Sequence, residues 1–130
     1  MLIDNLYLQG IDDQLGIIPQ DDTFLDASLS QSHRIDSNDI PLYVHWPYER
    51  LLRMDVIKQP DVLLAYMLLG DSFCDKETFA RCYRYYEPRT THDSSLSACV
   101  HGVLAAELGL LNKAYEFMSN SVRLDLDNRN

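Results

Sequence analysis

The feature that most constrains the fold of this chain is the run VLLAYMLL at positions 62–69, which is apolar on every side. Pro60 precedes this run and Gly70 follows it. The run is too long for a typical buried strand, and proline suits the first turn of a helix, so the pattern predicts a buried helix. A helix without a polar face needs protein on all sides. The chain also begins and ends without a clear stop signal, and both features suggest a portion of a larger structure.

Two helices are predicted after this run. The first is capped by Asp75 and stopped by Pro88. Its apolar face repeats at i, i+3, i+4 and i+7 and consists of Phe79, Cys82, Tyr83 and Tyr86. The second ends just before Gly109, a residue type expected immediately beyond a helix C-terminus. Its apolar face consists of Val100, Leu104 and Leu108.

A fourth helix is predicted to begin at Asn112, with an apolar face formed by Tyr115, Met118 and Val122. Four helices joined by short loops within residues 56–130 predict an all-α fold with antiparallel neighbours. Residues 1–50 are expected to be mostly irregular, since short apolar patches alternate there with polar stretches such as SLSQSHRIDSNDIP.

Composition and charge limit the possible partners. The 130 residues suit one domain or a piece of a larger one, and 46% hydrophobic with 24% charged residues is typical of a soluble globular chain. The net charge of −9 would repel a nucleic-acid backbone. Any anion site must therefore be local, built from backbone N–H groups and a few side chains.

The cysteines and the N-terminus favour a cytoplasmic location. Cys74, Cys82 and Cys99 form no CxxC pair and are odd in number, as in a reducing compartment. The first positive residue is Arg34, so the start does not resemble a signal peptide. No apolar run approaches the roughly 20 residues that span a bilayer.

The stretch THDSSLS, at positions 91–97, precedes the third helix and offers more polar groups than a cap needs. The unpaired N–H groups of a helix N-terminus can bind phosphate, and Ser94, Ser95 and Ser97 could add hydroxyl donors. His92 could add a further donor or a positive charge. The simpler interpretation is that Asp93 or Ser94 caps the helix and that the neighbouring residues are solvated.

A serine nucleophile is disfavoured at this stretch. There is no G-x-S-x-G motif after a strand, and the contiguous residues His92, Asp93 and Ser94 point in different directions, whereas triads are assembled in space. A small hydrolase using these residues remains an alternative, which an unchanged esterase activity in Ser94→Ala would exclude.

Other polar and aromatic residues have both a structural and a functional interpretation. Lys58 and Gln59 stand at the entry of the buried helix, where both could donate to sugar hydroxyls or simply be solvated. The aromatic residues of YVHWPYER could stack on a sugar ring or pack a loop onto the core; they are Tyr43, Trp46 and Tyr48.

No metal site or catalytic carboxylate pair is predicted. Cys99 and His101 lack a metal-binding spacing, so His101 is expected to be a packed, hydrogen-bonded helix residue. The carboxylates are scattered, and none can be named as one of a catalytic pair: Asp21, Asp22, Asp55, Asp61 and Glu107.

Several segments together resemble glycoside hydrolase family 65, the group of maltose, trehalose and kojibiose phosphorylases. The similar stretches are LGIIPQDDTFLD, VIKQPDVLLAYMLLGDSF, YYEPRTTHDSSLS, HGVLAAELGLLNKAYEFM and RLDLDN. They occur in family order and cover most of the chain from residue 15 onward, with the strongest likeness to the maltose phosphorylases. Pro60 and Arg89 depart from otherwise family-like motifs.

This resemblance implies a partial catalytic domain over residues 1–130, formed by the later helices of an (α/α)6 barrel. It implies inverting phosphorolysis of an α-linked glucose disaccharide, with phosphate as co-substrate and no other cofactor. Lys58 and Gln59 would hold the nonreducing glucose. Ser94, Ser95 and His92 would bind phosphate, with Asp93 shaping the loop.

The family's general-acid glutamate belongs to a segment upstream of these residues, and a further phosphate-contacting histidine belongs downstream. The resemblance therefore implies that the 130 residues alone do not turn over substrate. The alternative is a helical interaction or structural module without catalysis. Exposed apolar surface is expected to cause self-association, such as a homodimer.

Overall fold

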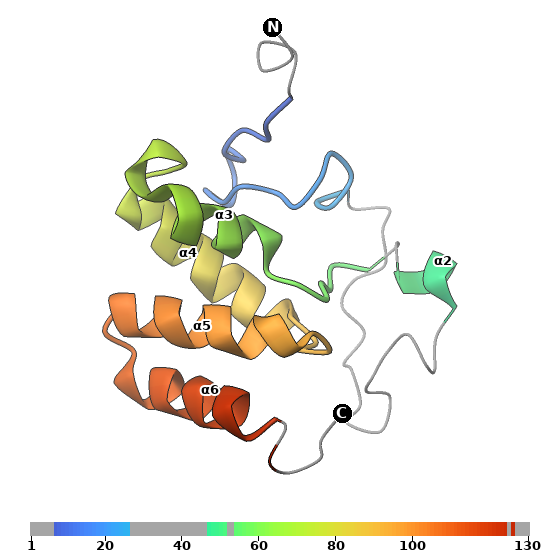
Figure 1. The fold of residues 1–130 in the computed structure, drawn as a ribbon. Coiled ribbons are helices and arrows are strands. Elements are labelled where there is room, and N and C mark those ends of the chain that lie inside the picture. The colour runs from blue at the N-terminus through green and yellow to red at the C-terminus, as the bar shows by residue number, and fades with distance from the viewer. Residues whose placement is uncertain (1–6, 27–46, 52–53, 125, 127–130) are drawn as a thin grey trace, which may run out of the picture.

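The computed structural model describes residues 7–26, 47–51, 54–124 and 126. Four helices carry the fold (Figure 1): α3 (Asp61–Leu69), α4 (Lys76–Tyr86), α5 (Ser95–Glu107) and α6 (Leu111–Arg123). A single helical turn, α2 (Tyr48–Leu51), precedes them, and 3-10 turns at Gly70–Ser72 and Glu87–Arg89 follow α3 and α4. The prediction of four helices after residue 56 is therefore confirmed. Within the described residues, no helix is long and apolar enough to cross a membrane.

The helices are arranged so that α3 and α5 begin at the same end of the molecule. Figure 1 shows α5 and α6 as antiparallel neighbours, and α3 contacts both α4 and α5. The segment before α3 is paired with the segment before α5 through a parallel bridge between Ile57 and Thr90. Ile57 donates its N–H to the carbonyl of Arg89 at 2.9 Å, and Thr91 donates to the carbonyl of Ile57 at 2.9 Å. The two helix N-termini are thereby held close together.

The core is built around the predicted apolar face of α4. Phe79, Cys82, Tyr83 and Tyr86 are each at most 1% exposed. Phe79 stacks on Tyr66 of α3 with ring centroids 3.8 Å apart. The hydroxyl of Tyr86 donates to the carbonyl of Ile18 at 2.7 Å, so the N-terminal segment is fixed against α4. Ile17, Ile18 and Phe24 are buried in this core although they belong to no helix.

The helix boundaries agree with the local signals in two of three cases. Asp75 caps α4, since its carboxylate accepts the N–H of Thr78 at 2.8 Å. Gly109 has φ of 75° and donates to the carbonyl of Ala106, a left-handed terminus that glycine adopts without strain. The predicted start at Asn112 is wrong, because α6 begins at Leu111 with Leu110 at the N-cap position.

The predicted apolar face of α6 is largely exposed in the part of the chain that the structure describes. Tyr115, Met118 and Val122 are 78%, 44% and 66% exposed, whereas Ala114 is the buried residue of this helix. The helix contacts α5 in part through Phe117, whose ring centroid lies 5.3 Å from that of His101. On α3, Leu68 and Leu69 are also largely exposed. The helix predicted to need protein on every side is therefore covered on one side only.

Candidate functional site at the N-terminus of α5

Ser94 occupies the N-cap position of α5 without using its side chain as a cap. Its backbone is extended, with φ of −102° and ψ of 132°, and its side chain makes no capping hydrogen bond. The cap is made by the backbone alone, since the carbonyl of Ser94 accepts the N–H of Ser97 at 3.0 Å. The Ser94 hydroxyl is thus left for another partner, and Ser95 beside it is exposed. The simpler interpretation of THDSSLS, in which the Ser94 side chain caps the helix, is therefore wrong for Ser94.

His92 is held in a rarely populated backbone conformation. Its φ is 56°, in the left-handed region that non-glycine residues seldom adopt. Its Nδ1 lies 2.9 Å from the hydroxyl of Ser97, and its ring centroid is 4.7 Å from that of His101 and 5.0 Å from that of Phe117. Backbone strain of this kind persists only where surrounding contacts fix the residue.

Ser97 and His101 lie one turn apart on α5 and are both 0% exposed. The Nδ1 of His101 is 2.9 Å from the carbonyl oxygen of Ser97. The expectation of a packed, hydrogen-bonded His101 is confirmed. The suggestion that Ser97 offers its hydroxyl directly to an anion is wrong, because its side chain is buried against the two histidines.

Burial keeps both imidazoles neutral at pH 7. Desolvation by burial, with a smaller contribution from electrostatic repulsion by His101, lowers the pKa of His92 to about 4. Desolvation also lowers the pKa of His101, although its hydrogen bond to Ser97 opposes this change. His92 can therefore act as a hydrogen-bond donor or acceptor in this site, but it does not supply the positive charge considered from the sequence.

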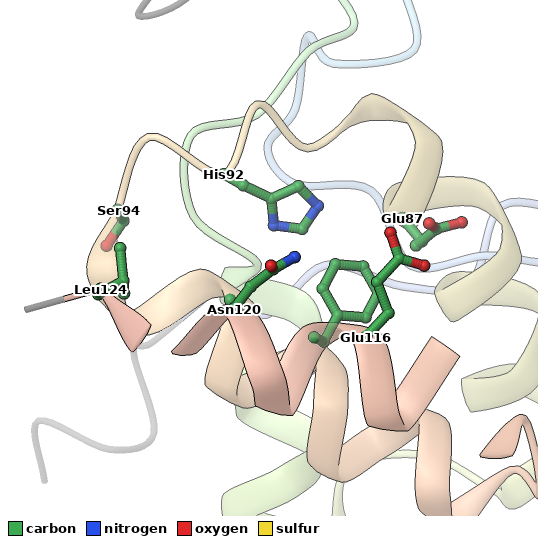
Figure 2. A pocket seen from close by; sticks show the side chains of 8 residues that line it. Glu87, His92, Ser94, Glu116, Asn120 and Leu124 are labelled. Atoms are coloured by element: carbon green, nitrogen blue, oxygen red, sulfur yellow. The ribbon is translucent and has the colours of Figure 1, made fainter. Parts of the chain in front are cut away.

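A pocket of about 370 Å³ opens beside His92 and Ser94, between the start of α5 and the end of α6. Its lining residues are Glu87, His92, Ser94, Ala98, Glu116, Phe117, Asn120 and Leu124. Figure 2 shows the His92 ring with Ser94 on one side and Glu87 on the other, and with Asn120 facing it from α6. Glu87 is paired with Lys113 at 2.6 Å. Glu116 adds a second carboxylate to the lining, and the negative charge on this side of the pocket opposes the approach of an anion.

Lys58 and Gln59 are exposed and lie immediately after the bridge that joins Ile57 to Thr90. The predicted sugar-binding and phosphate-binding residues are thereby brought to the same end of the helices, although Lys58 and Gln59 do not line the pocket. Arg89 fixes this arrangement, since it pairs with Asp55 at 3.1 Å and lies over the ring of Tyr85 at 3.9 Å. Tyr43 and Trp46 lie outside the described residues, as does the side chain of Tyr48.

Sequence reasoning missed the part of the pocket that α6 supplies. Glu116 and Asn120 reach His92 only because α6 folds back along α5, and no short-range pattern predicts that approach. The pairing of Ser97 with His101 was accessible, since residues at i and i+4 share one face of a helix. The carboxylates without an assigned role all accept hydrogen bonds from side chains: Asp21 from Thr23, Asp22 from Gln9, Asp55 from Arg89, Asp61 from Gln20 and Glu107 from Tyr66.

Comparison with known proteins identifies the family. The model of the glycosyl hydrolase family 65 central catalytic domain matches residues 1–130. The chain is 46% identical over 118 residues to a maltose phosphorylase of Bacillus subtilis, covering 91% of this chain and 16% of that protein. It is 43% identical over 127 residues to an α,α-trehalose phosphorylase of Thermoanaerobacter brockii, covering 98% of this chain and 16% of that protein.

A solved structure shows the same fold. A putative kojibiose phosphorylase from the human microbiome superimposes with a TM-score of 0.79 at 37% identity, over 93% of this chain and 17% of that one. The chain thus spans about one sixth of the length of the proteins that it matches. Its helices form part of an (α/α)6 barrel, as the resemblance implied. The chain belongs to glycoside hydrolase family 65, and the relatives that it matches include maltose and trehalose phosphorylases.

Proposed function

We propose that this chain supplies the phosphate-binding loop and part of the glucose site of an inverting maltose phosphorylase. The observation that carries the proposal is the Ser94 hydroxyl, which stands at the N-terminus of α5 and is not used as a cap. Unpaired N–H groups and the positive end of the helix dipole favour an anion at this position. Lys58 and Gln59, at the same end of the helices, would hold the nonreducing glucose.

The reaction needs little covalent chemistry from these residues. A phosphate oxygen attacks the anomeric carbon, the glycosidic C–O bond breaks, and the departing oxygen takes a proton from an acid that another segment supplies. The anomeric configuration inverts, giving β-glucose 1-phosphate and glucose. Phosphate is already an anionic nucleophile, so no second carboxylate is needed to activate it, in contrast to an inverting hydrolase. The loop would position the nucleophile and balance its charge.

Maltose is the substrate that we propose, because the maltose phosphorylase of Bacillus subtilis has 46% identity to this chain. The trehalose phosphorylase at 43% is nearly as similar, so the test must include both sugars. Cys74, Cys82 and Cys99 are all free thiols, which supports a reducing cytoplasm as the place of this activity.

The test uses a chimeric phosphorylase, in which this chain replaces the matching segment of the Bacillus subtilis enzyme. We expect it to release β-glucose 1-phosphate from maltose only when phosphate is present. Trehalose and kojibiose should give much slower release, measured by coupled assay and by NMR of the product anomer. Glucose release that does not depend on phosphate would instead indicate a hydrolase. A folded chimera without any turnover would contradict the proposal.

Ser94→Ala in the chimera separates phosphate binding from capping. A hydrogen bond to a charged ligand is worth roughly 1.5–3 kcal/mol, so the KM for phosphate should rise about tenfold to a hundredfold. The melting temperature should stay unchanged, because the hydroxyl makes no capping bond. Ser72→Ala, at an exposed serine in the turn after α3, is the matched control and should change neither quantity. A lower melting temperature with an unchanged KM would show that Ser94 is only a cap.

The alternative is an interaction module, and the exposed apolar face of α6 is the observation that favours it. We propose that the isolated 130 residues do not turn over maltose, because the general acid would lie elsewhere. Both views therefore expect an inactive isolated chain, and only the chimera separates them.

A further inference from the structure

The directions of two hydrogen bonds made by Ser97 can be assigned from the chemistry of their donor and acceptor atoms. A carbonyl oxygen only accepts, so the 2.9 Å contact between the carbonyl of Ser97 and Nδ1 of His101 requires a proton on that Nδ1. Since burial keeps His101 neutral, its Nε2 carries no proton. The single ring proton of His101 is therefore donated to the carbonyl oxygen of Ser97, one turn earlier in α5.

The hydroxyl of Ser97 then has one acceptor among the described residues. It lies 3.5 Å from Nδ1 of His101, which is already protonated, and 2.9 Å from Nδ1 of His92. The Ser97 hydroxyl therefore donates to His92, and Nδ1 of His92 is the unprotonated nitrogen. A neutral imidazole with a bare Nδ1 carries its single proton on Nε2.

Ser97 and His101 cannot touch a ligand, because both are 0% exposed. His92 does line the pocket beside Ser94. Its backbone is strained at φ of 56°, so the contacts of its ring with Ser97, His101 and Phe117 must hold it in place. Buried residues that orient a ligand-binding imidazole through its second nitrogen are a common device in enzyme sites.

We infer that Ser97 and His101 are positioning residues that fix His92 in its Nε2–H tautomer, so that His92 donates a hydrogen bond to the bound phosphate. This assignment rests on the proposed function for the identity of the ligand. His101 donates to the backbone carbonyl of Ser97, and the Ser97 hydroxyl donates to His92. The Nε2–H group of His92 is thereby a neutral donor, which can hold phosphate without changing its protonation over the neutral pH range.

The test compares substitutions in the chimeric phosphorylase. Ser97→Ala removes the donor to Nδ1 and should raise the KM for phosphate about fivefold to tenfold, while the KM for maltose stays unchanged. If the alanine variant does not fold, Ser97→Cys serves in its place, since its weaker donor should give a smaller rise in the same direction. A purely structural role would instead lower the melting temperature and change both KM values or neither.

His92 itself provides a matched pair that tests the tautomer. The amide nitrogen of glutamine can replace Nε2–H, whereas asparagine reaches only the position of Nδ1. We expect His92→Asn to raise the KM for phosphate at least tenfold, and His92→Gln to raise it clearly less. Equal effects of the two variants, or a larger effect of His92→Gln, would overturn the inference. A chimera that splits maltose normally but without phosphate would reject the proposed function instead, and the two failures are distinguishable.

Discussion

At the scale of single residues, the environment of His92 has a consequence for stability as well as for binding. Its pKa is about 4 in the folded chain and about 6.5 when unfolded. Between these values the unfolded state binds a proton that the folded state does not. The free energy of unfolding should therefore be highest above pH 6.5 and should fall as the pH drops toward 4. Urea denaturation at pH 7.5 and pH 5 measures this difference.

The control for this prediction is His92→Gln, which removes one titrating group and leaves His101 in place. The variant should lose less stability than the parent between pH 7.5 and pH 5, although it begins from a lower value. Carboxylates with a lowered pKa, such as Asp75, lose their contribution only at more acidic pH, so they do not obscure this window. An identical pH dependence of the two proteins would contradict the burial of a neutral His92.

Residue-scale prediction from the sequence succeeded where the signal was local. Asp75 and Gly109 are correct because a cap and a left-handed terminus depend on residues within one turn. His101 was correctly expected to be packed. The packing around His92 could not be predicted, because it involves Phe117, which lies 25 residues further along the chain on α6.

At the scale of elements, the close packing of α5 on α6 depends on Gly102. A Cβ added at this position would lie 3.2 Å from Met118 Cγ and 3.3 Å from both the backbone N of Met118 and Cβ of Phe117. The backbone atom cannot yield without moving α6. We expect Gly102→Val to lower the free energy of unfolding by about 1–3 kcal/mol, as overpacking typically does. Displacement of Phe117 should also weaken phosphate binding in the chimera.

Ala106→Val on the same helix is the matched control. Ala106 is exposed, so the added methyl groups meet solvent and the cost should be a few tenths of a kcal/mol from helix propensity. Thermal denaturation of the two variants beside the parent gives the comparison. Equal destabilisation would show that the close approach at Gly102 is not required.

At this scale the sequence predicted all four helices, but it did not predict which surface each apolar helix face contacts. An amphipathic pattern indicates which side of a helix is apolar, and Tyr115, Met118 and Val122 do share a side of α6. It does not indicate which protein surface covers that side. The contact with α5 uses Phe117 and the close approach of Met118 to Gly102, because glycine allows the two backbones to approach. Ile18 likewise joins the core through hydrogen bonds with Cys82 and Tyr86 of α4, more than 60 residues away in sequence, which no short pattern predicts.

At the scale of the whole molecule, large apolar side chains remain exposed on several of the described helices. Leu111 and Tyr115 of α6 are 71% and 78% exposed, Leu96 of α5 is 66% exposed, and Leu68 of α3 is 71% exposed. The matched phosphorylases are about six times longer than this chain. In the isolated chain these side chains face water, and apolar surface of this extent favours association.

We therefore expect the isolated chain to self-associate, with an apparent mass above 15.0 kDa that increases with concentration in light scattering. Tyr115→Glu with Val122→Glu should shift the mass toward the monomer, because two charges placed on the α6 face oppose its burial. Tyr7→Glu with Leu8→Glu adds the same charge at side chains that are 74% and 76% exposed and should leave the association unchanged. If both pairs dissociate the chain equally, the net charge of −9 controls association and the α6 face does not. If only the first pair acts, the face that α6 leaves open is the surface on which the chain associates.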